Sequence, residues 1–240
     1  MGNPNDFTFV ITGNITKEEA QRLADKYLRF PSVSFVADST TVYPEGGNRG
    51  KMSRFVSMNI GRDIATVVCS FNLESEPSLK DMISCRLASQ AFQTRCMQNI
   101  REKEGGVYAI NVNPSIDNRL SDGKFHYSIN AEFNCSPADA ERLKQRVIEE
   151  WNKMTTEGVD ENEYISVSRN LTRKMSAEED NAMARSRHIS EGIISDVPVL
   201  SPENYYRQIE EMNRDNVNKM IRRMKTEGYP IDVIFMSTQH

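Results

Sequence analysis

The sequence predicts an α+β fold, in which helices pack on one face of a sheet that is rich in antiparallel strands. Three observations support this prediction. Runs rich in β-branched and aromatic residues occur at 54–60, 65–73, 107–112 and 125–133. A long run with apolar residues every four positions separates them, and a helical block follows. The last apolar run, 231–236, is again strand-like and can pair back into the sheet.

Composition narrows the class of protein. The 240 residues carry 30 Lys and Arg against 34 Asp and Glu, a formal net charge of −4, so no basic excess points to nucleic acid or to a membrane surface. No apolar run approaches the ~20 residues of a membrane helix. We therefore expect residues 1–240 to form one soluble domain. The polar residues 1–6 run straight into a strand, as in a segment of a longer chain, so the compartment is unknown and the cell envelope is possible.

The first elements follow from local signals. Residues 7–11 alternate as a strand, Gly13 and Asn14 turn the chain, and Thr16 to Glu19 fits a capping box for a helix that ends near Leu28. The stretch 38–50 is rich in glycine and is predicted to be an exposed linker.

The strands at 54–60 and 65–73 are separated by a Gly-Arg-Asp turn, so we expect a hairpin. In the second strand, alternation predicts that Val67, Cys69, Phe71 and Leu73 face the core. The four cysteines lack the spacing of a zinc or redox site and are interpreted as buried thiols.

A long amphipathic helix is predicted from Leu79, and the paired glycines Gly105 and Gly106 should end it. The strands 107–112 and 125–133 should then pair as antiparallel neighbours. In the second, apolar residues alternate with a polar face made of His126, Ser128, Asn130 and Glu132. Four or five helices should follow, with N-caps at Ser136 and Ser201 and a capping box from Asp160 to Glu163.

Few residues offer hydrolytic chemistry, because the chain contains only three histidines. His126 on a polar strand face is more simply a solvated or hydrogen-bonded side chain. The segment from His188 to Gly192 is an H-x-x-E-H zinc motif whose last ligand is replaced by glycine, which leaves the zinc cage incomplete. No residue of this chain is therefore expected to bind a metal.

A further segment, Ile100 to Tyr108, places Arg101 at a helix end and Tyr108 in a strand seven residues later. Spacing alone makes this pair ordinary, because arginine is favoured at helix C-termini and tyrosine is common in strands. However, this segment resembles a signature of the last domain of the pitrilysin/insulinase family of zinc peptidases. The opening residues 9–20 resemble the strand, Gly-Asn turn and helix that begin the same domain, and the order of elements agrees throughout the chain.

The resemblance implies a split active site. In that family two halves close around a peptide, and the zinc lies in the other half. Arg101 would hold the substrate carbonyl and Tyr108 would donate to the oxyanion, while His126, Ser128, Asn130 and Glu132 would line the chamber. The implied partners are a peptide substrate and an N-terminal zinc-bearing half, in the same protein or in a partner subunit. The isolated chain should be inactive.

Two alternatives stay open at this point. The first is a non-catalytic subunit, related to processing peptidases or core proteins, that binds peptides or scaffolds a complex. The second is an unrelated α+β binding domain. An H-x-x-E-H segment elsewhere in the parent gene, or in an adjacent gene, would favour the peptidase.

Overall fold

The sheet is the centre of the fold. The computed structural model describes residues 7–28, 50–58, 63–101, 107, 109–117, 123–179, 181–194 and 199–237. Within these residues, five strands form one sheet in the order β1-β5-β2-β4-β3. Their bounds are β1 Met52–Met58, β2 Ala65–Ser75, β3 Ile110–Asp117, β4 Phe125–Cys135 and β5 Tyr229–Ser237. The predicted strands at the middle and end of the chain are thus confirmed, with β3 beginning three residues later than expected.

Strand pairing corrects one prediction. β3 and β4 are antiparallel neighbours as expected, but β1 and β2 form no hairpin, because β5 lies between them. β5 pairs antiparallel with β2 and parallel with β1. The composition explains this order. β5 has adjacent apolar residues, Val233 and Ile234, which suits an interior strand, whereas the polar residues of β1 suit an edge.

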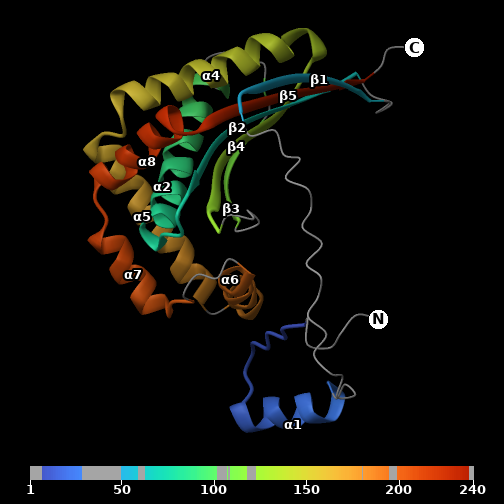
Figure 1. Cartoon of the computed structure of the whole chain (residues 1–240), viewed down its shortest axis with the longest axis vertical. Coiled ribbons are helices and arrows are strands. Elements are labelled where there is room, and N and C mark those ends of the chain that lie inside the picture. Colours follow the sequence, from blue (N-terminus) through green and yellow to red (C-terminus); the bar gives the residue numbers. More distant parts are fainter. Residues whose placement is uncertain are drawn as a thin grey trace.

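The helices pack on one face of the sheet, which confirms the predicted α+β class (Figure 1). α2, α4 and α8 lie nearest the strands, and α5, α6 and α7 extend this layer. Five α-helices follow β4 in the described part of the chain, in agreement with the predicted helical block. The bounds are α2 Leu79–Cys96, α4 Ala140–Glu157, α5 Glu161–Glu179, α6 Ala182–Ile194, α7 Pro202–Glu211 and α8 Arg214–Thr226.

The core lies between the sheet and these helices. Val67, Cys69, Phe71 and Leu73 are all buried, as alternation predicts. The ring of Phe71 stacks on Trp151 of α4 with 4.1 Å between centroids. All four cysteines are free and buried, and burial raises the pKa of Cys69 to about 12, so this thiol stays protonated at neutral pH. They behave as core residues, as predicted.

Most local helix signals are also confirmed. The exceptions are Ser136, whose hydroxyl donates to the Asp139 carboxylate and caps no amide, and Glu19, whose carboxylate accepts from Arg22, so the box at Thr16 is only half formed. The Glu19 amide donates to Thr16 Oγ1 at the start of α1 (Lys17–Tyr27), and the Asn204 amide donates to Ser201 Oγ at the start of α7. At the start of α5 the two residues of the predicted capping box bond reciprocally. The Asp160 amide donates to Glu163 and the Glu163 amide donates to Asp160, both at 2.9 Å.

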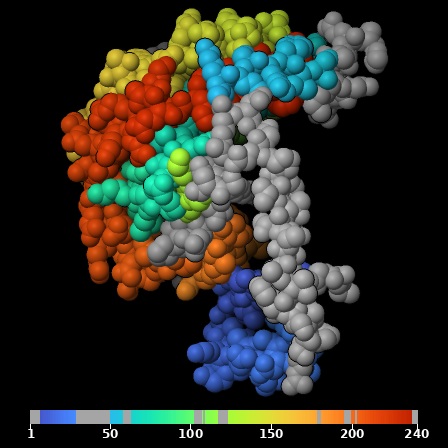
Figure 2. Space-filling view, in the orientation of Figure 1, coloured from blue at the N-terminus to red at the C-terminus, as the bar shows by residue number. Residues whose placement is uncertain are grey.

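The N-terminal segment protrudes from the body of the molecule beside α6 (Figures 1 and 2). Residues 7–11 are extended, but they have no sheet partner among the described residues, so the predicted strand is wrong as an element of this sheet. Phe7, Phe9 and Ile11 are 50–56% exposed, and α1 buries no residue. One hydrogen bond, from the Thr12 hydroxyl to the carbonyl of Ala182, joins this segment to α6. The core is therefore complete without residues 7–28.

Three predictions fall largely or wholly outside the described residues. The linker predicted at 38–50 is described only at Gly50, and the turn predicted at 61–63 only at Asp63. The long helix is described to residue 101, so the glycines predicted to end it also lie outside the described residues.

Candidate functional site

Arg101 is the last residue of a short segment in which the helix changes from α to π geometry. α2 ends at Cys96, and Met97–Arg101 form a π-helical turn, where the sequence predicts a continuous α-helix. Short π-helical segments are rare and occur frequently at functional sites. Ile100 is buried and anchors the turn, whereas Arg101 is exposed and has no hydrogen-bond or ion-pair partner among the described residues. Tyr108 lies outside the described residues.

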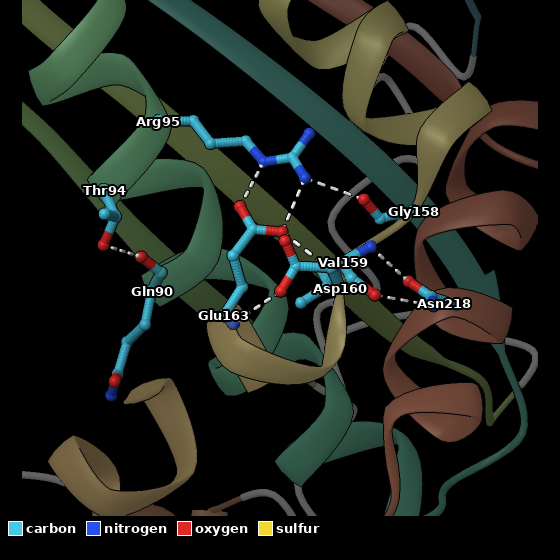
Figure 3. Close-up of polar contacts among 8 residues, drawn as sticks. All are labelled: Gln90, Thr94, Arg95, Gly158, Val159, Asp160, Glu163 and Asn218. Atoms are coloured by element: carbon cyan, nitrogen blue, oxygen red, sulfur yellow. Dashed lines mark hydrogen bonds and ion pairs between the residues drawn. The ribbon is translucent and has the colours of Figure 1, made fainter. Parts of the chain in front are cut away.

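A polar cluster fixes the end of α2 just before this turn (Figure 3). The Arg95 guanidinium donates two hydrogen bonds to the Glu163 carboxylate, each 2.7 Å long, and a third of 2.7 Å to the carbonyl of Gly158. Glu163 belongs to the first turn of α5, and Gly158 ends α4. Arg95 therefore ties three helices together six residues before Arg101. Such bidentate pairs hold both position and orientation.

The turn between α4 and α5 is held from its other side by Asn218 of α8 (Figure 3). The Val159 amide donates to Asn218 Oδ1 at 2.7 Å, and Asn218 Nδ2 donates to the Val159 carbonyl at 3.1 Å. Gly158 has a φ of +77°, a conformation that strains any residue with a Cβ, and a Cβ there would lie 3.0 Å from the Asn218 side chain. Glycine is thus required at this turn.

The charge of Glu163 is well stabilised. Burial by itself would raise the pKa of its carboxyl, but the hydrogen bonds from Arg95 and from the Asp160 amide outweigh burial and lower that pKa. Because the pKa is lowered in the folded state, the stabilisation is present above the unfolded value near 4.5 and is lost as the pH falls through the folded value.

We expect Glu163→Gln to lower the free energy of unfolding by about 1–3 kcal/mol at pH 7, because hydrogen bonds to charged groups contribute this much and Arg95 loses its charge partner. Urea unfolding followed by circular dichroism measures the change. The difference from wild type should shrink as the pH falls through the lowered pKa. Glu149→Gln is the matched control, because its pair with Arg146 is about half exposed and should contribute less than about 1 kcal/mol. Equal effects of the two substitutions would contradict the assigned role of Arg95.

The polar face of β4 lies on the side of the sheet away from the helices. His126 Nε2 is 3.0 Å from Asn72 Oδ1 of β2, which makes His126 a hydrogen-bonded side chain, one of its two expected states. Asn130 donates to Ser128 Oγ at 2.9 Å, and Ser70 donates to Asn72 Oδ1 at 3.0 Å. These residues share one face because Ser70 is opposite Asn130 and Asn72 is opposite Ser128 in the register.

The polar face of β4 is less exposed to solvent than strict alternation predicts. Ser128 is only 3% exposed and Asn72 only 2% exposed, whereas Glu132 is exposed. Both residues lie in interior strands and bond within the sheet, where Asn72 Nδ2 donates to the carbonyls of Ser70 and Tyr229 and Ser128 Oγ accepts from Asn130. Alternation places Ser70 and Asn72 on the face opposite the core, but the sequence did not identify them as neighbours of the polar face of β4, because that requires the register of β2 with β4. In the described residues, no hydrogen bond or ion pair joins Arg101 to this face.

His188 lies in α6, and its ring meets the edge of Tyr205 with 5.8 Å between centroids. Glu191, the other residue of that incomplete motif, forms an ion pair with Arg86 of α2 at 3.6 Å. Within the described residues, no three His, Cys, Asp or Glu side chains are grouped to hold a metal ion. Nor is any described helix long and apolar enough to cross a membrane.

Comparison with protein families gives a direct result. The family model described as the peptidase M16 inactive domain matches residues 2–171, which include Arg101, Tyr108 and the polar face of β4. The chain belongs to this family. The pitrilysin/insulinase-type fold that the signature segments imply is thereby confirmed.

Relatives agree with this assignment. The probable zinc protease PqqL of Escherichia coli (strain K12) is 22% identical over 230 residues, 92% of this chain and 23% of that protein. The solved structure of periplasmic PqqL matches 94% of this chain and 25% of that chain, with 18% identity and a TM-score of 0.71. This chain therefore spans about a quarter of the length of PqqL.

Two solved chains that are shorter than PqqL have the same fold over about half of their length. The structure of a peptidase M16 inactive domain from Pseudomonas fluorescens matches 95% of this chain and 53% of that chain, with 15% identity and a TM-score of 0.67. The structure of a protease from Helicobacter pylori matches 94% of this chain and 53% of that chain, with 11% identity and a TM-score of 0.73. In each, the region that this chain matches is about half of the solved chain.

Proposed function

We propose that this chain is the C-terminal, non-zinc-binding domain of a zinc metallopeptidase, and that it closes the peptide chamber opposite a zinc-bearing half. In this proposal Arg101 and Tyr108 bind the substrate during peptide-bond hydrolysis. The observation that carries it is the family match over residues 2–171, because the matched region contains the helix-to-strand segment of both residues. PqqL is described as periplasmic, and we propose the cell envelope for the parent of this chain too.

Arg101 suits the task of holding a carbonyl oxygen. Its side chain is permanently charged and offers a planar fork of donors. It is exposed at a helix end, and it has no competing acidic partner among the described residues. The Arg95 cluster, six residues earlier, holds the helix that carries it. The guanidinium can thus reach outward while its backbone stays fixed.

Tyr108 supplies a different donor. A tyrosine hydroxyl with an ordinary pKa near 10 stays protonated at neutral pH and can donate a hydrogen bond to an oxyanion. The zinc ion, when bound in the other half, would polarise the scissile carbonyl. Arg101 and Tyr108 would then stabilise the negative charge that develops on the same oxygen.

The exposed apolar side chains of the N-terminal segment indicate that it packs against a neighbouring domain. Phe7, Phe9 and Ile11 form one apolar edge, and Tyr27 on α1 is 68% exposed. Large apolar side chains grouped on a surface mark an interaction site. We propose that residues 7–28 pack against the adjacent domain of the parent enzyme, which leaves the sheet of this chain free to face the chamber.

The test is an assay of the parent enzyme on an internally quenched fluorescent peptide. Arg101→Ala should lower kcat/KM by about 10²-fold, because a charged donor to the reacting carbonyl is lost. Arg101→Lys should recover only part of that loss, because the ammonium lacks the planar fork. The matched control is Arg169→Ala on the exposed side of α5, which should leave kcat/KM unchanged.

Three outcomes oppose the proposal. Equal activity of Arg101→Ala and Arg169→Ala would remove Arg101 from the site. Appreciable zinc-dependent proteolysis by the isolated chain would show that it holds a complete site of its own. A parent or partner without any H-x-x-E-H segment would favour instead a non-catalytic subunit that binds peptides or scaffolds a complex.

A further inference from the structure

A cavity of about 440 Å³ opens on the helix-covered side of the sheet, between α4, the end of α8 and the edge strand β1. This volume lies in the range of small-molecule sites. None of the residues assigned to the peptidase site lines it. The cavity is therefore a separate feature of the domain.

The inner wall of the cavity is aromatic. Phe71 and Trp151 both line it, and each is 3% exposed, so the cavity reaches the core. Their rings are nearly parallel, with an interplanar angle of 11°. A flat apolar group that enters the cavity would meet side chains already fixed in position, which lowers the entropy lost on binding.

One acidic and one basic side chain of the cavity wall form a buried ion pair. Asp232 is buried, and its carboxylate lies 3.2 Å from Lys144 Nζ and accepts a 2.5 Å hydrogen bond from the Ser53 hydroxyl. Lys144 also pairs with Glu141 at 2.9 Å. This buried pair is therefore already neutralised within the protein.

Two further lysines line the same cavity, and neither has an acidic partner in the part of the chain that the structure describes. Lys225 donates to Asn152 Oδ1 at 2.5 Å, and neither Lys225 nor Lys51 forms an ion pair with an acid in the described residues. Asp232 is the only carboxylate among the described residues that line the cavity. The described residues of the cavity wall thus include three lysines and one carboxylate, an excess of positive charge, although the whole chain has a net charge of −4.

We propose that this cavity binds a carboxylate attached to a flat apolar body. The chemical class is a peptide whose C-terminal residue is aromatic and carries the free carboxylate. The ring would lie against Trp151, and the carboxylate would accept hydrogen bonds from Lys51 and Lys225. This site is independent of the Arg101 site, so Arg101→Ala should leave its affinity unchanged.

Trp151 is the only tryptophan of the chain, so its fluorescence reports on the cavity directly. The probe is N-acetyl-phenylalanine, and the matched control probe is its amide, which has the same ring and no charge. Titration of the 240-residue chain with the carboxylate, with excitation at about 295 nm, should give a saturable change and a roughly millimolar dissociation constant, as expected for a ligand of this size. The amide should bind at least about fivefold more weakly.

Substitutions at the rim test the role of charge while the buried pair stays intact. Lys225→Met keeps the aliphatic stem and removes the charge, and it should weaken binding of the carboxylate about two- to fivefold. Lys219→Met, on the exposed side of the same helix, is the control and should change nothing. Equal binding of the amide, equal effects of the two substitutions, or the absence of a saturable signal would each overturn the proposal.

Discussion

Replacing Tyr108 with phenylalanine in the parent peptidase should lower kcat by about 10²- to 10³-fold, which is the usual loss when one oxyanion donor is removed. Phenylalanine retains the aromatic ring, so only the hydroxyl is lost. Because the hydroxyl acts on charge that develops in the transition state, KM should change much less than kcat. Turnover of an internally quenched peptide measures both constants.

The control for this experiment is Tyr27→Phe, which removes a hydroxyl from a largely exposed tyrosine on α1. It should leave kcat unchanged. A thermal unfolding curve identical to that of wild type would confirm that the Tyr108→Phe domain is folded. Near-normal turnover by a folded Tyr108→Phe enzyme would refute the assignment.

Gly228→Ala should destabilise the domain by about 3–5 kcal/mol, among the largest effects of a single substitution. Gly228 precedes β5, and a Cβ at this position would lie 1.9 Å from the carbonyl oxygen of Asn72 and 2.6 Å from that of Met224. Both atoms belong to the backbone, in β2 and in α8, so neither can swing aside. The clash must push the end of α8 away from β2, which forces apart packed elements of the core.

Thermal unfolding by circular dichroism should place the Tm of Gly228→Ala about 10 °C below that of wild type, given about 2–4 °C per kcal/mol in a domain of this size. Glu227→Ala changes the neighbouring residue, whose side chain is 56% exposed and pairs with Arg223, and it should shift the Tm by less than about 3 °C. If Gly228→Ala fails to accumulate while Glu227→Ala is soluble, the clash is supported. A Gly228→Ala protein as stable as wild type would show that the strand can shift.

Short-range patterns in the sequence predicted most of the elements, because the forces behind them are local. Alternation in 65–73 placed Cys69, Phe71 and Leu73 in the core, since side chains of a strand point to opposite faces in turn. The capping box at Asp160 and Glu163 was readable because its donors and acceptors are three residues apart.

Contacts between residues far apart in the sequence could not be predicted from local patterns. The partner of β1 is β5, which lies about 180 residues later, so the adjacent strand β2 was a wrong guess for a hairpin. Residues 7–11 have a strand pattern, but a strand exists only where a partner satisfies its backbone groups. The residues of the candidate site also fall into two groups, one predicted from the sequence and one found only in the structure. Arg101 and Tyr108 were predicted from a family resemblance, whereas the contact of Arg95 with Glu163, 68 residues away, needed the structure.

The strand order has a consequence for synthesis on the ribosome. Because β5 separates β1 from β2, β1 has no place in the sheet until Tyr229–Ser237 have been made. At about 5–20 residues per second, the nascent chain spends roughly 10 to 35 seconds between the emergence of β1 and that of β5. During this interval the edge of β2 that β5 will cover exposes unpaired backbone N–H and C=O groups, a state prone to wrong pairing. The final residues of this domain therefore decide when folding can finish, and a chaperone that shields β2 would act within that interval.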